Sequence, residues 1–156
     1  GAGAVRNLVW DALHEKSRPS ALSDVDVAYF DGDAMGDAGQ ELQLQRRLHL
    51  ALPRIPWEVT NQARVHHWFA GHFGHEVDPL PDLEAAVASW PEYATSVGLT
   101  LNDNDSITVI APHGLDDLFA MIVRRNPTRV SVETYRQRVE QKRYVQRWPR
   151  VTVTIE

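Results

Sequence analysis

The alternation of strand-like and helix-like segments is the feature that most constrains how this chain can fold. The run Asp-Val-Asp-Val-Ala-Tyr-Phe at residues 24–30 predicts a strand, and residues 4–15 carry apolar side chains at the spacing of a helix. Further helices are predicted over 40–50, 82–89, 114–123 and 132–148, further strands over 57–65, 97–101, 107–111 and 151–155, and a loop over 70–81. This mixed order is typical of an α/β or α+β domain in which helices pack against a mixed β-sheet.

Length and composition fit one globular domain. The 156 residues are 43% hydrophobic and 24% charged, which is the balance of a folded protein that can bury a core. There is no cysteine, which excludes disulfides, thiolate metal sites and cysteine nucleophiles and favours a reducing cytoplasm. No apolar run approaches the roughly 20 residues of a membrane span. The chain opens on Gly1-Ala-Gly-Ala without methionine, so we interpret residues 1–156 as a single domain whose N-terminus is a cut edge.

The charge balance argues against a nucleic-acid duplex as a partner. The formal net charge is −5, so broad attraction to DNA is not expected. Basic residues do crowd into 136–150, where the ordinary interpretation is a solvated helix face. This segment matters for function only if it faces a metal site, where Lys142 would contact a triphosphate or the acceptor.

Two aspartates on the first predicted strand form the clearest candidate site. Asp24 and Asp26 are two residues apart, so their side chains project from the same face of the strand. Neighbouring carboxylates repel unless a cation lies between them, and Mg²⁺ prefers such oxygen ligands together with substrate phosphates. Glu58, in the next predicted strand, is the best third carboxylate for a two-metal arrangement. Asp31 and Asp33 lie at the far end of the first strand and are expected to be too distant.

A small-residue turn before the first helix is a candidate phosphate site. Gly3 and Ala4 open the helix, and the free backbone N–H groups and positive dipole end of a helix N-terminus favour anions. Arg6, in the first turn, would add a charge-assisted contact to the phosphates.

The histidines and large aromatic residues have ordinary interpretations. His66, His67, His72 and His75 are irregularly spaced and accompanied by no cysteine, so we expect surface histidines rather than zinc ligands. Among these histidines, His66 alone is expected to reach an active-site cleft, because it follows Arg64 on the second predicted strand. Trp90, Phe119, Tyr135 and Trp148 are expected in the core rather than as platforms for a base.

Together, residues 3–7 (Gly-Ala-Val-Arg-Asn) and 23–27 (Ser-Asp-Val-Asp-Val) resemble the nucleotidyltransferase superfamily of DNA polymerase β and the CCA-adding enzymes. Members of that superfamily have a glycine-containing turn and helix before a strand with two aspartates separated by one residue; many have Gly-Gly or Gly-Ser where this chain has Gly3-Ala4. Further segments look like a bacterial family of predicted nucleotidyltransferases of unassigned substrate, namely 57–64, 90–92, 111–119, 142–143 and 148–149.

The resemblance implies a polymerase β-type fold and a metal-dependent transfer of a nucleoside monophosphate from an NTP to an unknown acceptor, with release of pyrophosphate. It implies Mg²⁺ or Mn²⁺ as the cofactor, held by Asp24, Asp26 and Glu58 as catalytic residues. The nucleotide-binding residues that it suggests are Gly3, Ala4, Arg6, Ser23, Asn61, Arg64 and Lys142. Asn61 has a second interpretation as a plain polar group of the strand. The alternative function is a non-catalytic nucleotide-binding or partner-binding module on the same fold.

Overall fold

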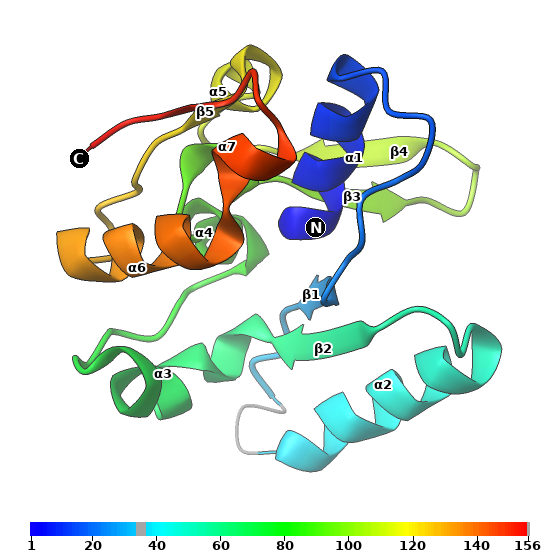
Figure 1. Cartoon of the computed structure of the whole chain (residues 1–156). Coiled ribbons are helices and arrows are strands. Elements are labelled where there is room, and N and C mark those ends of the chain that lie inside the picture. The colour runs from blue at the N-terminus through cyan, green and yellow to red at the C-terminus, as the bar shows by residue number, and fades with distance from the viewer. Residues whose placement is uncertain (34–36, 156) are drawn as a thin grey trace.

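Helices and strands alternate along the chain in the mixed order that the sequence predicts (Figure 1). The structure is a computed structural model and describes residues 1–33 and 37–155. The helices are α1 (Gly3–Leu13), α2 (Ala38–Ala51), α3 (Val65–Phe73), α4 (Leu83–Ala88), α5 (Asp116–Ala120), α6 (Val132–Lys142) and α7 (Tyr144–Arg147), with 3₁₀ turns η1 (Gln62–Arg64) and η2 (Tyr93–Thr95). The strands are β1 (Val25–Tyr29), β2 (Trp57–Asn61), β3 (Gly98–Leu101), β4 (Ile107–Ile110), β5 (Ile122–Val123) and β6 (Thr152–Val153). Among the helices of the described ranges, none has the length and apolar character that crossing a bilayer requires.

The strands of the described residues pair in short sheets instead of one continuous sheet. β1 runs parallel to β2, with α2 as the connection, and this register places Asp26 opposite Glu58. β3 and β4 form the predicted antiparallel hairpin, and β5 pairs with β6. In Figure 1, β2, α2 and α3 form one side of the molecule, α1 and the C-terminal helices form the other, and β1 lies at the junction.

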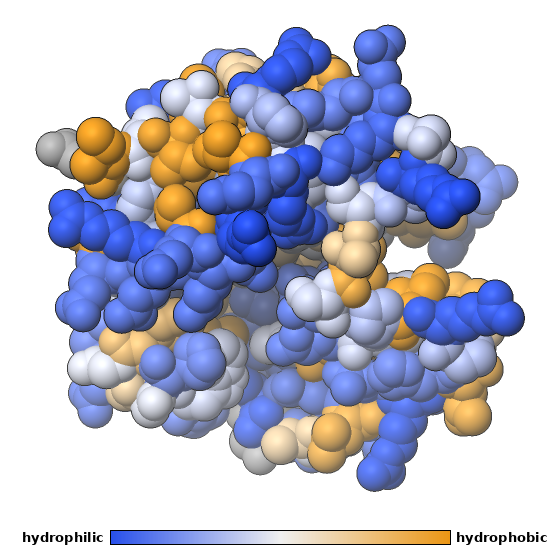
Figure 2. All heavy atoms as spheres, viewed as in Figure 1, coloured by the Kyte–Doolittle hydropathy of each residue, from blue (hydrophilic) through white to orange (hydrophobic). Residues whose placement is uncertain are grey.

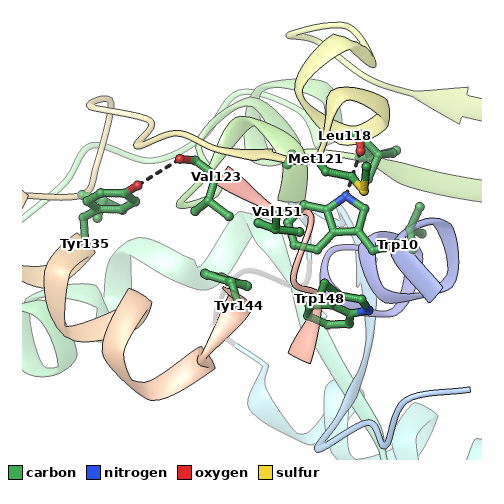
Figure 3. Close-up of a cluster of buried hydrophobic side chains, with 12 residues drawn as sticks. Trp10, Leu118, Met121, Val123, Tyr135, Tyr144, Trp148 and Val151 are labelled. Atoms are coloured by element: carbon green, nitrogen blue, oxygen red, sulfur yellow. Dashed lines mark hydrogen bonds between the residues drawn. The ribbon is translucent and has the colours of Figure 1, made fainter. Parts of the chain in front are cut away.

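The main core joins α1 to the C-terminal part of the chain (Figure 3). Trp10 and Trp148 are fully buried and meet edge to face, with ring centroids 5.3 Å apart. Each indole N–H has a partner: Trp10 Nε1 donates to the carbonyl of Leu118 at 2.8 Å, and Trp148 Nε1 donates to Asp11 Oδ1 at 2.8 Å. The packing and the hydrogen bonds hold α1 against α5 and the segment after α7. They therefore also fix the turn at the start of α1.

The segment 57–65 is a strand only as far as Asn61, and the prediction for its remainder was wrong. The Asn61 side chain accepts a hydrogen bond from Ala63 N at 3.1 Å and starts the turn η1. Helix α3 follows and extends through Phe73, so it also covers the first part of the predicted loop at 70–81. The physical reason is burial: Val65 and Phe69, four residues apart, both lie inside the protein.

Two predicted helices are shorter than expected. The helix at 114–123 ends at Ala120 because Met121 takes a left-handed backbone with φ 58°, after which the chain continues as β5. The long helix at 132–148 breaks at Arg143, where φ is 52°, into α6 and α7. Left-handed φ is incompatible with the α-helix, and the change of direction brings Tyr144 into the core.

Candidate metal and nucleotide site

Three carboxylates come together at the junction between the two sides of the molecule. Asp24 immediately precedes β1, Asp26 lies on it, and Glu58 is the partner of Asp26 on β2. One oxygen from each carboxylate lies within 4.8 Å of the others. Asp24 and Asp26 are half-buried and Glu58 is exposed, so the cluster is open on one side. The sequence predicted these residues as a group, and the parallel register explains why they meet.

The electrostatics of this cluster suit a divalent cation. Burial raises the pKa of the Asp26 carboxyl, and the neighbouring charge of Asp24 raises it further. Burial also raises the pKa of Glu58, with additional contributions from Asp26 and Asp24. Close carboxylates with raised proton affinity are groups whose charges are not fully compensated by the protein. A hard dication with oxygen ligands compensates such charges, so these residues fit the group that the sequence implied.

The carboxylates open on a cavity of about 370 Å³. The N-terminal end of α1 contributes Gly3 and Arg6 to its wall, and α6 contributes Lys142. Figure 2 shows this face of the molecule hollowed between the C-terminal helices and the β2–α3 segment, with hydrophilic residues along the upper rim. Four basic side chains line the cavity: Arg6, Arg129, Arg138 and Lys142. Cations beside the carboxylates make this cavity suitable for an anion that also binds a metal ion.

Arg6 is held in a fixed position in the first turn of α1. Its side chain is buried, with the residue only 3% exposed. Nη1 donates to Thr95 Oγ1 at 3.1 Å, and the guanidinium lies 5.0 Å from the ring centre of Tyr144. Its buried Nε has no hydrogen-bond partner within the described residues. A Cβ at Gly3 would lie 3.2 Å from Nη2 of Arg6, so glycine leaves the room that the guanidinium needs beside the turn.

Arg138 is positioned by a buried carboxylate that the sequence did not identify. Its Nε donates to Glu92 Oε1 at 2.8 Å and its Nη2 to Oε2 at 3.2 Å, so the pair is bidentate. Glu92 is only 1% exposed. Burial alone would raise the pKa of Glu92, but the charge and hydrogen bonds of Arg138 outweigh burial and hold that pKa below its ordinary value. Glu92 therefore stays ionised and directs Arg138 to the cavity.

Replacing Glu92 with glutamine is expected to lower the free energy of unfolding by about 3 kcal/mol at neutral pH, because it leaves a largely buried guanidinium without its counter-charge. In the wild type, the folded-state pKa of Glu92 lies below its ordinary 4.5. The contribution of the Glu92–Arg138 pair to the free energy of unfolding is therefore complete above pH 4.5, and it is lost as the pH falls through the folded-state pKa of Glu92.

Urea titrations of wild type and Glu92→Gln between neutral pH and pH ~3 would measure the loss of unfolding free energy and its pH dependence. The difference in unfolding free energy between the two proteins should become smaller in acid. Glu133→Gln is a matched control, because Glu133 lies exposed on α6 beyond this ion pair. Equal stability of Glu92→Gln and wild type at neutral pH would contradict the structural role of the pair.

Not every predicted nucleotide-binding residue reaches the cavity. Gly3, Arg6 and Lys142 line it, and Ser23 lines a neighbouring cavity. Although Asn61 and Arg64 belong to the described part of the chain, neither is part of the cavity wall. Asn61 is fully buried. Its side-chain amide accepts a hydrogen bond from the backbone N–H of Asp31 and donates one to the carbonyl of Asp31. This arrangement matches the interpretation of Asn61 as a plain polar group of the strand.

Arg64 Nη1 lies 2.6 Å from Glu41 Oε1 in an ion pair. Ala4 lies in the first turn of α1 outside the cavity wall of the described chain. Asn61, Arg64 and Ala4 therefore lie outside the wall of this cavity, and their role in nucleotide binding stays a prediction.

Aromatic residues at the other end of the cavity were not identified from the sequence. Trp68, Phe69 and Phe73 of α3 form this wall, whereas Trp90 lines the cavity beside Gly1, next to the start of α1. The spacing of the apolar residues at 65, 69 and 73 was the available signal, but the prediction of a strand and a loop across this segment concealed it. Tyr135 and Trp148 are in the core as predicted.

Three other aromatic and histidine predictions need correction. Phe119 is 55% exposed and is not a core residue, and Trp90 is half-buried in the cavity wall instead of in the core. His72, rather than His66, lies in the cavity wall.

Comparisons with known proteins agree with this geometry. A family model described as "Nucleotidyltransferase" matches residues 1–153. A solved structure described as "The NMR structure of the protein reveals a CCA-adding enzyme head domain" is similar over 99% of this chain and 79% of its own, with 30% identity and a TM-score of 0.80. A comparison with curated proteins found no match. Because the family match covers nearly the whole chain, this protein belongs to a family of nucleotidyltransferases.

Proposed function

We propose that this chain is a metal-dependent nucleotidyltransferase that transfers a nucleoside monophosphate from an NTP to an acceptor hydroxyl. The observation that supports this most is the position of Asp24, Asp26 and Glu58 in the wall of a cavity whose other side carries Arg6 and Lys142. A site for an NTP with a divalent ion needs both kinds of group at once. Neither a plain anion site nor a plain cation site would combine them.

Each group has a defined role in the proposal. Asp24, Asp26 and Glu58 would hold Mg²⁺ or Mn²⁺, which supplies charge neutralisation at the phosphates and acidifies the attacking hydroxyl. Arg6 and Lys142 line the same cavity and would contact the polyphosphate. In the transfer, the acceptor oxygen bonds to the α-phosphorus while the bond from that phosphorus to the α,β-bridging oxygen breaks. Pyrophosphate leaves and the hydroxyl proton is lost to solvent.

The aromatic end of the cavity suits the nucleoside. Phe69 is buried and Trp68 is 44% exposed, so the wall offers an apolar surface to a flat base. This end lies on α3 and the phosphate-binding residues lie on α1 and α6. The cavity thus combines charged and apolar aromatic groups, the combination that is typical of ligand sites.

Calorimetry with each NTP in the presence of Mg²⁺, paired with an assay of pyrophosphate release, tests the proposal. We expect metal-dependent binding of at least one NTP, and release of pyrophosphate when an acceptor is supplied. Absence of metal-dependent binding for every NTP contradicts the proposal. Binding without release across an extract of metabolites and RNA would instead favour a non-catalytic nucleotide-binding module.

Replacing Lys142 with alanine is expected to weaken NTP binding about tenfold or more, because one charged hydrogen bond to phosphate contributes roughly 1.5–3 kcal/mol. Burial lowers the pKa of the Lys142 ammonium, and the charges of Arg138 and Arg6 add to this effect. An anion at this point would relieve the repulsion among these cations. Arg136→Ala, an exposed position on the same helix, is the control and should bind like wild type. Equal affinity of both variants would remove Lys142 from the phosphate site.

A further inference from the structure

A second, larger cavity lies on the other side of the carboxylates. It has a volume of about 810 Å³ and is bounded by α2, β2 and α3. Asp24 and Glu58 line both cavities, as do Thr60, Trp68 and His72. The proposed catalytic centre therefore has an entrance from each of two directions. One entrance is the basic cavity already assigned to the NTP, and the second has no assigned occupant.

The two cavities differ sharply in charge. The first contains three arginines and a lysine. Among the described residues that line the second, there is no lysine or arginine. Its carboxylate on α2, Glu41, is paired with Arg64 at 2.6 Å, and Arg64 is outside the cavity wall. The wall is therefore close to neutral once the carboxylate cluster holds a metal ion.

Apart from Pro56 and Val59, the remaining groups of the second cavity are hydrogen-bonding and aromatic side chains. They are Ser23, Gln45, His49, Trp57, Thr60, Trp68 and His72. Indole faces pack against the C–H groups of a carbohydrate ring, and hydroxyl, amide and imidazole groups bond its hydroxyls. Proteins that bind single-stranded nucleic acid instead track its backbone with a positively charged groove. This cavity lacks the groups for that.

We infer, on the basis of the proposed function, that the second cavity binds the acceptor, and that the acceptor is a small polyhydroxylated compound without negative charge rather than the end of a nucleic acid. With the NTP in the basic cavity, the shared carboxylates Asp24 and Glu58 would lie between the two substrates, and an acceptor hydroxyl would have to approach the α-phosphorus opposite the leaving pyrophosphate. Phosphoryl-type transfer requires this roughly in-line arrangement. The chemistry of the wall fits both a neutral sugar and an amino sugar.

Transfer of label from α-labelled NTPs to three acceptor pools tests the inference. The pools are RNA oligonucleotides with a free 3′-hydroxyl, neutral sugars, and amino sugars, each with Mg²⁺. We expect label in one or both sugar pools and none in RNA. Label in RNA, or in none of the pools for a protein that binds NTP with Mg²⁺, overturns the inference. If metal-dependent NTP binding is itself absent, the proposed function fails instead, so the two failures are distinguishable.

A charge placed in the second cavity gives an independent test. His49→Lys adds a cation to the wall from α2 and is expected to raise the KM for an amino sugar about tenfold, through repulsion, with the KM for NTP unchanged. His67→Lys makes the same change at an exposed position outside both cavities and serves as the control. If His49→Lys instead improves transfer to RNA, the acceptor is anionic and the inference is wrong. An equal change in the KM for NTP also contradicts it, since the two substrates would then share one cavity.

Discussion

Asp26→Asn is expected to reduce pyrophosphate release at least about a thousandfold and to leave the fold intact. The carboxylate belongs to the cluster with Asp24 and Glu58, and Asp26 lies on β1 directly opposite Glu58 on β2. A metal ion provides several kcal/mol of charge stabilisation in the transition state, and each 1.4 kcal/mol corresponds to a factor of ten in rate. If the proposed function holds, loss of one ligand from this cluster is therefore expected to have a larger effect than loss of any peripheral contact to the phosphates.

The same substitution is expected to raise the stability of the metal-free protein. Burial and Asp24 hold the folded-state pKa of Asp26 above 3.8, so the ionised carboxylate at neutral pH favours the unfolded chain. Asparagine removes this charge. Urea unfolding in the presence of a chelator measures the gain, and circular dichroism verifies the fold.

Asp103→Asn is the matched control for this prediction. Asp103 lies exposed between β3 and β4, outside the cavity of the proposed site, and should leave both rate and stability unchanged. Turnover at the wild-type rate in Asp26→Asn would refute the assignment of the carboxylate cluster. A loss of activity together with a loss of folded structure would show that Asp26 acts on stability instead.

Trp148→Ala is expected to cost about 4 kcal/mol of folding free energy, within the range for truncating a large buried aromatic residue. Trp148 is fully buried against Trp10 and donates a hydrogen bond to Asp11. Its truncation leaves a cavity and removes one donor from a carboxylate inside the protein. For a domain of this length, the midpoint of thermal unfolding should fall by about 10 °C or more.

Thermal and urea unfolding of Trp148→Ala and Trp68→Ala would measure this difference. Trp68 is 44% exposed, so its removal is expected to change stability by less than about 1 kcal/mol. If the two variants unfold at the same midpoint, the contact of Trp148 with α1 contributes less to the folding free energy than its burial predicts.

The sequence was sufficient to predict the carboxylate pair because that geometry is local. Asp26 lies on β1 and Asp24 immediately before it, and residues two apart along an extended backbone share a face whatever the rest of the chain does. Glu58 required the register between β1 and β2, which the sequence does not fix, although the adjacent strand was the correct place to search. The family resemblance added the order of the elements, and the family match over residues 1–153 agrees with it.

The parts that could not be predicted depend on contacts between distant residues. Glu92 and Arg138 are 46 positions apart, and neither residue alone indicates a buried ion pair. Similarly, the family resemblance suggested Asn61 and Arg64 as nucleotide-binding residues, and the sequence predicted a strand that continues through both. The backbone turn after Asn61 directs them elsewhere, and tertiary packing of Phe69 stabilises a helix where the local pattern was ambiguous.

The proposed nucleotide site draws on both ends of the chain, because the carboxylates come from β1 and β2 whereas Lys142 comes from the end of α6. A bound NTP with its metal ion would therefore contact two segments at once, and these segments are more than eighty residues apart in the sequence, as counted from Glu58 to Lys142. By mass action, a ligand that binds only the assembled arrangement stabilises it by about 2.7 kcal/mol at a hundred times its Kd. During synthesis, the charged pocket remains incomplete until α6 has left the ribosome and docked, so a nascent chain that ends before α6 would carry the carboxylates without Arg138 and Lys142.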